Sequence, residues 1–135
     1  MARTKLTESA IKLIDGKNFA NVAFVMEGGV PHVSPVWVDR DGDVVLINTT
    51  DTGRVKSKYL KPGSKVALSI FDQNNPYQTV LIQGKVVERS KTGANEHIDK
   101  MAKKYINVDK YPYHQPGIER TIIRIEPEKI SKEMG

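Results

Sequence analysis

Short runs of β-branched and aliphatic residues, separated by turn-forming residues, constrain the fold of this sequence more than any other feature. Val and Ile favour strands, whereas Gly, Pro, Asn and Asp interrupt them. The runs predict six strands: Val22–Met26, Val30–Val38, Val44–Asn48, Val66–Phe71, Val80–Glu88 and Arg120–Ile125. Most connections between them are short, which favours antiparallel neighbours over parallel strands joined by crossover helices.

The residues between the runs predict how the strands connect. Glu27-Gly28-Gly29 and Asp39–Asp43 predict turns, which would make the first three runs a three-stranded meander. Pro62-Gly63 predicts another turn, Asp72–Pro76 a polar loop, and Pro127 the end of the last strand.

Short helices accompany the strands. Thr7 can cap a first helix that ends near Gly16, and Thr50–Leu60 predicts a loop with a brief helix. The segment Ala94–Tyr105 has apolar residues at helical spacing, namely Ile98, Met101, Ala102 and Tyr105. We therefore expect a mainly β fold, a closed or half-closed antiparallel barrel with short flanking helices, in one domain over residues 1–135.

Composition excludes several classes of protein. The chain has no cysteine, which rules out disulfide scaffolds, thiol nucleophiles and Cys-ligated zinc. No run of about 18 apolar residues and no leader-like start occur, so we expect a cytoplasmic protein with no membrane partner. The net charge of +5 favours an anionic partner without distinguishing nucleic acid from a phosphorylated small molecule.

Residues that could carry catalysis are scarce. His32, His97 and His114 lack the spacing of a metal site, so we expect them to pack or to lie on the surface, with no bound metal. Glycine-rich nucleotide motifs, metalloprotease helices and serine nucleophile elbows are also absent. No catalytic side chain is predicted.

The segment Thr52–Phe71 has a strong local charge imbalance. It contains no Asp or Glu and five basic residues: Arg54, Lys56, Lys58, Lys61 and Lys65. If a residue among 50–52 caps the brief helix, Arg54 and Lys56 lie near its first turn, where backbone N–H groups also favour an anion. The segment therefore predicts a phosphate site, and a solvated lysine-rich helix remains the alternative.

A second candidate segment surrounds Pro35. A proline within a predicted strand removes one ladder hydrogen bond, so this backbone faces a sheet edge, a bulge or a ligand. Trp37 shares a strand face with Pro35, and we expect it to be a core or interface residue. The loop Tyr111–His114 can shape a pocket or simply pack against a neighbouring element.

The order of several segments resembles one known family. The segments are Gly29–Trp37, Asp41–Asp43, Ile47–Thr50, Gly53–Lys56 and Lys58–Leu60, followed by Gln78–Gly84 and Arg120–Pro127. Together they resemble the pyridoxamine 5'-phosphate oxidase-like flavin-binding split-barrel family, most closely its branch that uses the deazaflavin coenzyme F420. The resemblance extends from about Phe24 to Ile125.

The resemblance implies a homodimer of six-stranded antiparallel split β-barrels, with FMN or coenzyme F420 bound between subunits. The cofactor residues that it implies are Ser34, Pro35, Val36, Ile47, Asn48, Thr49, Thr50, Arg54, Val55, Lys56, Gln78 and Thr79. Arg54 and Lys56 match the pair that holds the cofactor phosphate, and Gln78 and Thr79 match a contribution from the second chain. The implied function is hydride transfer to or from a small organic substrate.

Two departures and two alternatives accompany this interpretation. The chain is shorter than the vitamin B6 oxidases and lacks their C-terminal Trp and Arg pair, because Trp37 is its single tryptophan. A non-catalytic cofactor carrier of the same fold is the main alternative. A barrel that binds single-stranded nucleic acid is less favoured, because its cations gather at one helix instead of alternating with the aromatics Tyr59, Tyr77 and Tyr105.

Overall fold

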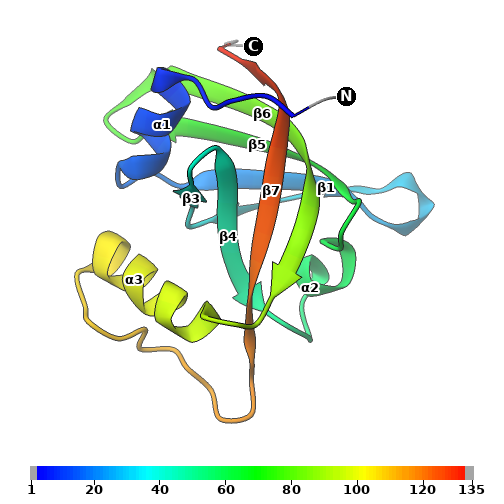
Figure 1. The fold of residues 1–135 in the computed structure, drawn as a ribbon, viewed down its shortest axis with the longest axis vertical. Coiled ribbons are helices and arrows are strands. Elements are labelled where there is room, and N and C mark those ends of the chain that lie inside the picture. The colour runs from blue at the N-terminus through cyan, green and yellow to red at the C-terminus, as the bar shows by residue number, and fades with distance from the viewer. Residues whose placement is uncertain (1–2, 133–135) are drawn as a thin grey trace.

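The computed structural model describes residues 3–132 and has a mainly β architecture (Figure 1). In chain order the elements are α1 (Glu8–Asp15), β1 (Ala20–Val25), the 3₁₀ turn η1 (Glu27–Gly29), β2 (Pro31–Val36), β3 (Asp39–Asp41), β4 (Val44–Thr50), α2 (Val55–Tyr59), β5 (Lys65–Asp72), β6 (Asn75–Ser90), α3 (Ala94–Ile106) and β7 (Arg120–Ser131). The antiparallel fold class and the three flanking α-helices are confirmed.

The strands form one antiparallel sheet in the order β2-β1-β5-β6-β7-β4-β3, which curls around the core. The long strand β6 joins the two halves, because it pairs with β5 and also with β7. The sheet has seven strands where the sequence predicts six. The prediction of a turn over Asp39–Asp43 is wrong in part, since Asp39–Asp41 pairs with Val44–Leu46 as β3.

The predicted three-stranded meander is also wrong. β1 and β2 form the expected hairpin, but β4 pairs with β3 and with β7, far away in the sequence. The apolar face of β4 explains this choice, because Ile47 lies opposite Ile123 and both are buried. β2 therefore forms an edge of the sheet, where Pro35 can lack an N–H without breaking a second ladder.

Two predicted boundaries differ from the structure. The polar loop predicted over Asp72–Pro76 is shorter, because Asp72 already pairs with Asn75. Pro127 does not end the last strand. It lies within β7 opposite Gly84, beside a register shift, and its carbonyl accepts a hydrogen bond from the Thr4 N–H at 2.9 Å. A side chain at Gly84 would collide with the carbonyl oxygen of Glu126, so this glycine permits the close approach.

Two of the helices follow their sequence signals closely. Thr7 caps α1 by accepting a hydrogen bond from the Ala10 N–H at 3.1 Å, and the Gly16 N–H closes the other end. The apolar stripe of α3 is buried as predicted. The largest fully buried side chains come from α1, from the end of α2 and from both halves of the sheet, and include Ile14, Ile47, Leu60, Leu68, Ile70, Ile82, Ile123 and Ile125.

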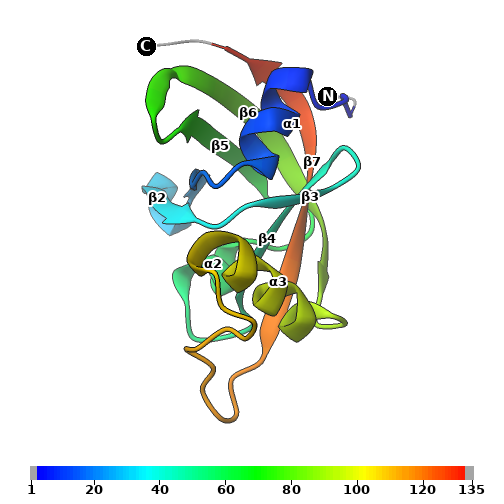
Figure 2. The same ribbon diagram turned by 90° about the vertical axis from the view of Figure 1, so that its left-hand side faces the viewer.

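The helices occupy opposite ends of the barrel (Figures 1 and 2). α1 lies at the end of the barrel where β7 ends, whereas α2, α3 and the segment from α3 to β7 lie at the other end. None of the helices within residues 3–132 is long and apolar enough to cross a membrane. Strand β4 runs to the end where α2 and α3 lie, and its last residues form part of a cleft there.

Candidate functional site

A cleft of about 350 Å³ lies where β2, β4, α2, α3 and the segment after α3 converge. Its lining residues are Phe19, Pro35, Val36, Trp37, Asn48, Thr49, Thr50, Arg54, Lys56, Ile98, Met101, Tyr111, Tyr113 and Arg120. The volume is within the range of small-molecule sites. The lining combines three cations, four aromatic rings and no carboxylate.

Lys56 is a half-buried cation without a carboxylate partner. Its Nζ donates a hydrogen bond to Ser34 Oγ at 3.2 Å, and no ion pair forms at this side chain among residues 3–132. Burial, and then the charge of Arg54, lower the pKa of Lys56 below its ordinary value. The folded chain therefore holds a positive charge here that it does not neutralise itself.

Arg54 begins α2. Its backbone N–H donates to Ser57 Oγ at 2.9 Å, and Ser57 Oγ donates back to the Arg54 carbonyl at 2.7 Å. The predicted cap among residues 50–52 is therefore wrong, because Arg54 itself is the N-cap and the first helical residue is Val55. A helix of five residues contributes a small dipole, so the side-chain cations dominate the local electrostatics.

Arg120, the first residue of β7, supplies the third cation of the cleft. Its Nε donates to Asn48 Oδ1 at 2.6 Å, and its guanidinium carbon lies 5.1 Å from the centroid of the Tyr111 ring. Burial lowers the pKa of Arg120, and the charge of Arg54 lowers it further. Arg54 is thus electrostatically coupled to both other cations of the cleft, which is unfavourable unless an anion binds between them.

Stacked aromatic rings form the apolar side of the cleft. Trp37 stacks on Tyr105 at 5.1 Å with an interplanar angle of 4°, and Phe19 stacks on Tyr105 at 5.5 Å. The Tyr105 hydroxyl donates to the Asn18 carbonyl at 2.6 Å, and burial raises the pKa of Tyr105 to about 12. Tyr111 meets Trp37 edge to face at 6.1 Å. Tyr105 is held by its hydroxyl bond and by stacking on Phe19, and it in turn fixes the Trp37 ring, which therefore presents a rigid flat surface.

The structure brings together most of the site residues that the sequence predicts. The cleft is lined by Pro35, Val36, Asn48, Thr49, Thr50, Arg54 and Lys56, and Ser34 contacts it through its bond to Lys56. Ile47 instead points into the core, with 1 % of its surface exposed, and Val55 is exposed outside the cleft. Gln78 and Thr79 line a different, polar depression beside α1. Within one chain these four do not join the cleft.

Several lining residues were missed or given another role by sequence reasoning. Ile98 and Met101 were expected only as the core stripe of α3, and Trp37 only as a packing residue. Tyr111 and Tyr113 line the cleft, and Tyr111 also packs edge to face on Trp37, so their loop does both of the things that the sequence left open. Phe19 and Arg120 were not predicted as site residues, although Arg120 begins the last predicted strand. Arg120 meets Asn48 across 72 positions, so only the pairing of β4 with β7 could reveal it.

The other basic and aromatic residues of interest lie elsewhere. None of Lys58, Lys61 and Lys65 lines the cleft, and Lys65 lines a separate depression on β1 and β5. Tyr105 is buried, so it is not available to stack on a nucleic acid base. Residues 3–132 contain no group of three His, Cys, Asp or Glu side chains arranged to hold a metal ion.

A family model and a solved structure both relate this chain to known proteins. Residues 6–133 match the family model described as pyridoxamine 5'-phosphate oxidase. A solved structure named F420 reductase is 25% identical, with a TM-score of 0.81, over 95% of this chain and 100% of that one. No curated protein matches the chain significantly.

More distant solved structures share the fold. The heme storage protein HutZ from Vibrio cholerae is 14% identical, with a TM-score of 0.63, over 95% of this chain and 94% of that one. An FAD and heme binding protein from Mycobacterium smegmatis is 16% identical, with a TM-score of 0.62, over 93% of this chain and 68% of that one.

Proposed function

The chain belongs to the pyridoxamine 5'-phosphate oxidase family, and from this premise we propose that its cleft binds a phosphorylated flavin-type cofactor, FMN or the deazaflavin coenzyme F420. The protein is then an oxidoreductase that transfers hydride to or from a small organic substrate. The observation that carries the proposal is the cleft with three cations and no carboxylate.

Arg54 and Lys56 are the residues that we assign to the cofactor phosphate. A phosphate would accept charge-assisted hydrogen bonds from both side chains and remove the repulsion between them. It would also compensate the burial that lowers the pKa of Lys56. Thr49 and Thr50 lie on the β4 side of the same cleft and add hydroxyl and backbone groups.

The apolar side of the cleft suits a flat ring system. Trp37, Pro35 and Met101 offer surfaces that orient a ring and exclude water from it. When bound, such a cofactor supplies the hydride chemistry itself, so the protein needs no acid-base dyad of its own. This is consistent with a lining that contains no His, Asp, Glu or Cys.

A homodimer is part of the proposal, because the barrel interior is filled by core side chains and a tricyclic ring needs an additional wall. Exposed apolar residues on β1 and β2, including Val25 and Val33 at 64% each, offer a surface for a second copy. The partner would contribute Gln78 and Thr79. Sedimentation tests this, and a monomer that binds cofactor at full affinity would contradict it.

One preparation of the full chain tests the cofactor. We expect the purified protein, or the protein mixed with FMN or coenzyme F420, to show the absorption of the bound ring, and mass spectrometry of the denatured sample to identify it. If neither cofactor binds at micromolar concentration, the proposal fails.

A non-catalytic carrier of the same fold is the second candidate, and the absence of an acid-base side chain from the cleft lining is compatible with it. Turnover separates the two. An enzyme would oxidise the bound reduced cofactor faster when a substrate is added, whereas a carrier would release the cofactor unchanged in redox state.

A further inference from the structure

Arg120 is held by a chain of hydrogen bonds that begins at Asp39 on β3. Asp39 Oδ2 lies 3.1 Å from His97 Nε2, and His97 Nδ1 lies 3.1 Å from Asn48 Nδ2. Asn48 Oδ1 then accepts the hydrogen bond of Arg120 Nε at 2.6 Å. The chain thus links β3, α3 and β4 to the first residue of β7.

The partners of Asn48 fix the direction of every bond in this chain. Its Nδ2 also donates to the Ala94 carbonyl at 2.9 Å, and its Oδ1 faces a guanidinium that can only donate. The amide therefore has one allowed orientation. His97 Nδ1 must accept, so its Nε2–H donates to the Asp39 carboxylate.

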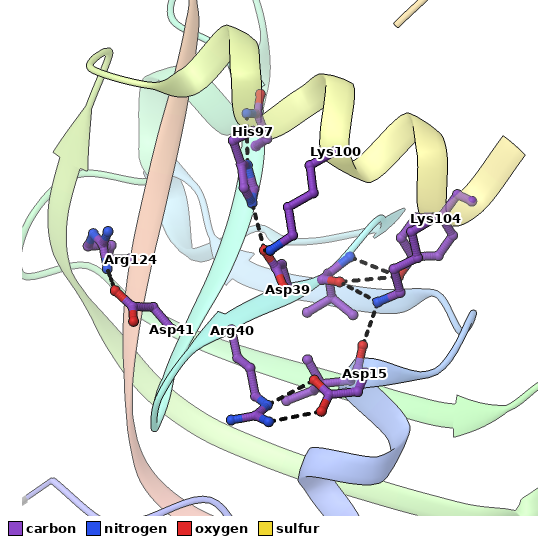
Figure 3. A network of polar contacts seen from close by, with 12 residues as sticks. Asp15, Asp39, Arg40, Asp41, His97, Lys100, Lys104 and Arg124 are labelled. Carbon is purple, nitrogen blue, oxygen red and sulfur yellow. Dashed lines mark hydrogen bonds and ion pairs between the residues drawn. The ribbon is translucent and has the colours of Figure 1, made fainter. Parts of the chain in front are cut away.

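The groups around the chain support this arrangement. Figure 3 shows His97 and Lys100, both on α3, converging on Asp39. The side chain of His97 is only 9% exposed, and that of Asp39 only 13%. A buried, directed chain of this kind is costly to leave unsatisfied, so it holds Asn48 in one position.

A second, smaller pocket of about 110 Å³ shares Arg120 with the cleft. It is lined by Thr50, Arg54, Tyr111, Tyr113, His114, Gln115, Ile118 and Arg120, again without a carboxylate. Arg120 Nη2 donates to the Asn48 carbonyl at 3.5 Å, the Tyr111 side chain also interacts with the guanidinium, and no carboxylate pairs with Arg120 within residues 3–132. Arg120 Nε is bonded to Asn48, and Tyr111 covers one face of the guanidinium. The N–H groups at the outer end of the guanidinium can therefore donate hydrogen bonds to one planar oxyanion.

We infer that Arg120 is the recognition residue for the carboxylate of a small apolar or aromatic molecule, and that Asp39, His97 and Asn48 are its positioning residues. The aromatic rings beside Arg120 provide the surface for the body of such a molecule. The inference rests on the proposed function only in assigning the cofactor phosphate to Arg54 and Lys56, which leaves Arg120 for the substrate.

The test uses benzoate as the probe and benzamide as its uncharged control. Trp37 is the only tryptophan, so its indole N–H signal in NMR reports on this cleft alone. We expect saturable shifts with benzoate and none with benzamide, both for the chain alone and with FMN bound. Arg120→Gln should weaken benzoate binding by about tenfold or more, whereas Lys91→Ala should leave it within about threefold.

Two variants of His97 separate positioning from stability. His97→Asn keeps an acceptor near Nδ1 for Asn48 but loses the contact with Asp39, and His97→Gln does the reverse. We expect benzoate affinity to survive in His97→Asn and to fall in His97→Gln by about tenfold. Equal losses that follow the loss of thermal stability would overturn the positioning role.

The remaining outcomes distinguish the two proposals. If FMN and coenzyme F420 fail to bind but benzoate binding depends on Arg120, the proposed cofactor is wrong and the carboxylate site stands. If benzoate binding is lost in Arg54→Ala and kept in Arg120→Gln, the probe uses the phosphate site and the inference is wrong. It is equally wrong if Arg120→Gln weakens coenzyme F420 but not benzoate, because the carboxylate then comes from the tail of the cofactor.

Discussion

Two charged regions of the molecule, the network between α1, β3 and α3 and the cleft beside α2, differ in how their cations are compensated. In the network between α1, β3 and α3, three cations lie beside carboxylates: Arg40 pairs with Asp15 at 2.8 Å, Lys100 with Asp39 at 3.3 Å, and Arg124 of β7 with Asp41 at 3.0 Å (Figure 3). Lys104 of α3 instead donates hydrogen bonds to the backbone carbonyls of Ile14 and Val38. In the cleft, Arg54, Lys56 and Arg120 have no carboxylate partner within residues 3–132.

Ions paired with a carboxylate add to the stability of the fold, whereas the unpaired cations of the cleft remain available to bind an anionic ligand. A paired surface ion contributes modestly to folding, whereas a half-buried unpaired cation opposes it. Folding disfavours the positive charge of Lys56, because a lowered pKa favours the neutral form of a lysine. Folding stabilises the negative charge of Asp39, because a lowered pKa favours the ionised form of a carboxyl group. The comparison predicts opposite effects of mutation in the two regions.

The largest effect is expected in cofactor binding. Arg54→Ala and Lys56→Ala should each weaken binding of FMN or coenzyme F420 by about 1.5–3 kcal/mol, the range for hydrogen bonds to charged groups, with little change in the free energy of unfolding. Fluorescence titration and urea denaturation measure the two quantities. The exposed, paired Lys91 is the control, and an equal loss in Lys91→Ala would refute the phosphate assignment.

The next effect concerns Asp39 and pH. Burial alone would raise the pKa of this carboxyl, but the hydrogen bonds from His97 and from the Arg40 backbone, together with the charge of Lys100, hold it at about 2, below its ordinary 3.8. The resulting stabilisation, about 2 kcal/mol, is present above pH 3.8 and is lost as the pH falls towards 2. The free energy of unfolding of the wild type should therefore exceed that of Asp39→Asn at pH 7, and the difference between the two should shrink as the pH falls below 3.8.

Urea denaturation at several pH values measures this gap. A gap that stays constant from pH 7 to pH 3 would show that the Asp39 charge contributes nothing to folding.

A smaller effect separates two cations of similar size. Lys56→Met should leave the free energy of unfolding unchanged or raise it by up to about 1 kcal/mol, because a half-buried charge is removed and packing is kept. Arg40→Met, in the paired region, should lower it by about 0.5–1 kcal/mol. The comparison fails if Lys56→Met destabilises more than Arg40→Met.

The smallest effect concerns the choice of cofactor. Coenzyme F420 carries an acidic tail, and Lys58, Lys61 and Lys65 continue the basic segment beyond Lys56. We expect F420 to bind more tightly than FMN, by a few tenths of a kcal/mol for each lysine that the tail approaches, with the difference shrinking at high salt. Dissociation constants at low and high ionic strength test this. A difference that is indifferent to salt would exclude the lysines as tail contacts.

Sequence reasoning worked where interactions are local. The cap at Thr7, the apolar stripe of α3 and the β1–β2 hairpin depend on residues within a few positions of one another, and all three are confirmed. It also found Arg54 and Lys56, because a basic segment without Asp or Glu is visible in the sequence itself.

The sequence by itself therefore determined the antiparallel β class, the positions of the helices and the phosphate candidates. Only the tertiary structure decided that β4 pairs with β7, that Pro127 stays inside a strand, and that Arg120 enters the cleft. The physical reason is that these features depend on contacts between distant segments. Their energies come from burial and strand pairing across the sheet, which no local pattern of residues encodes.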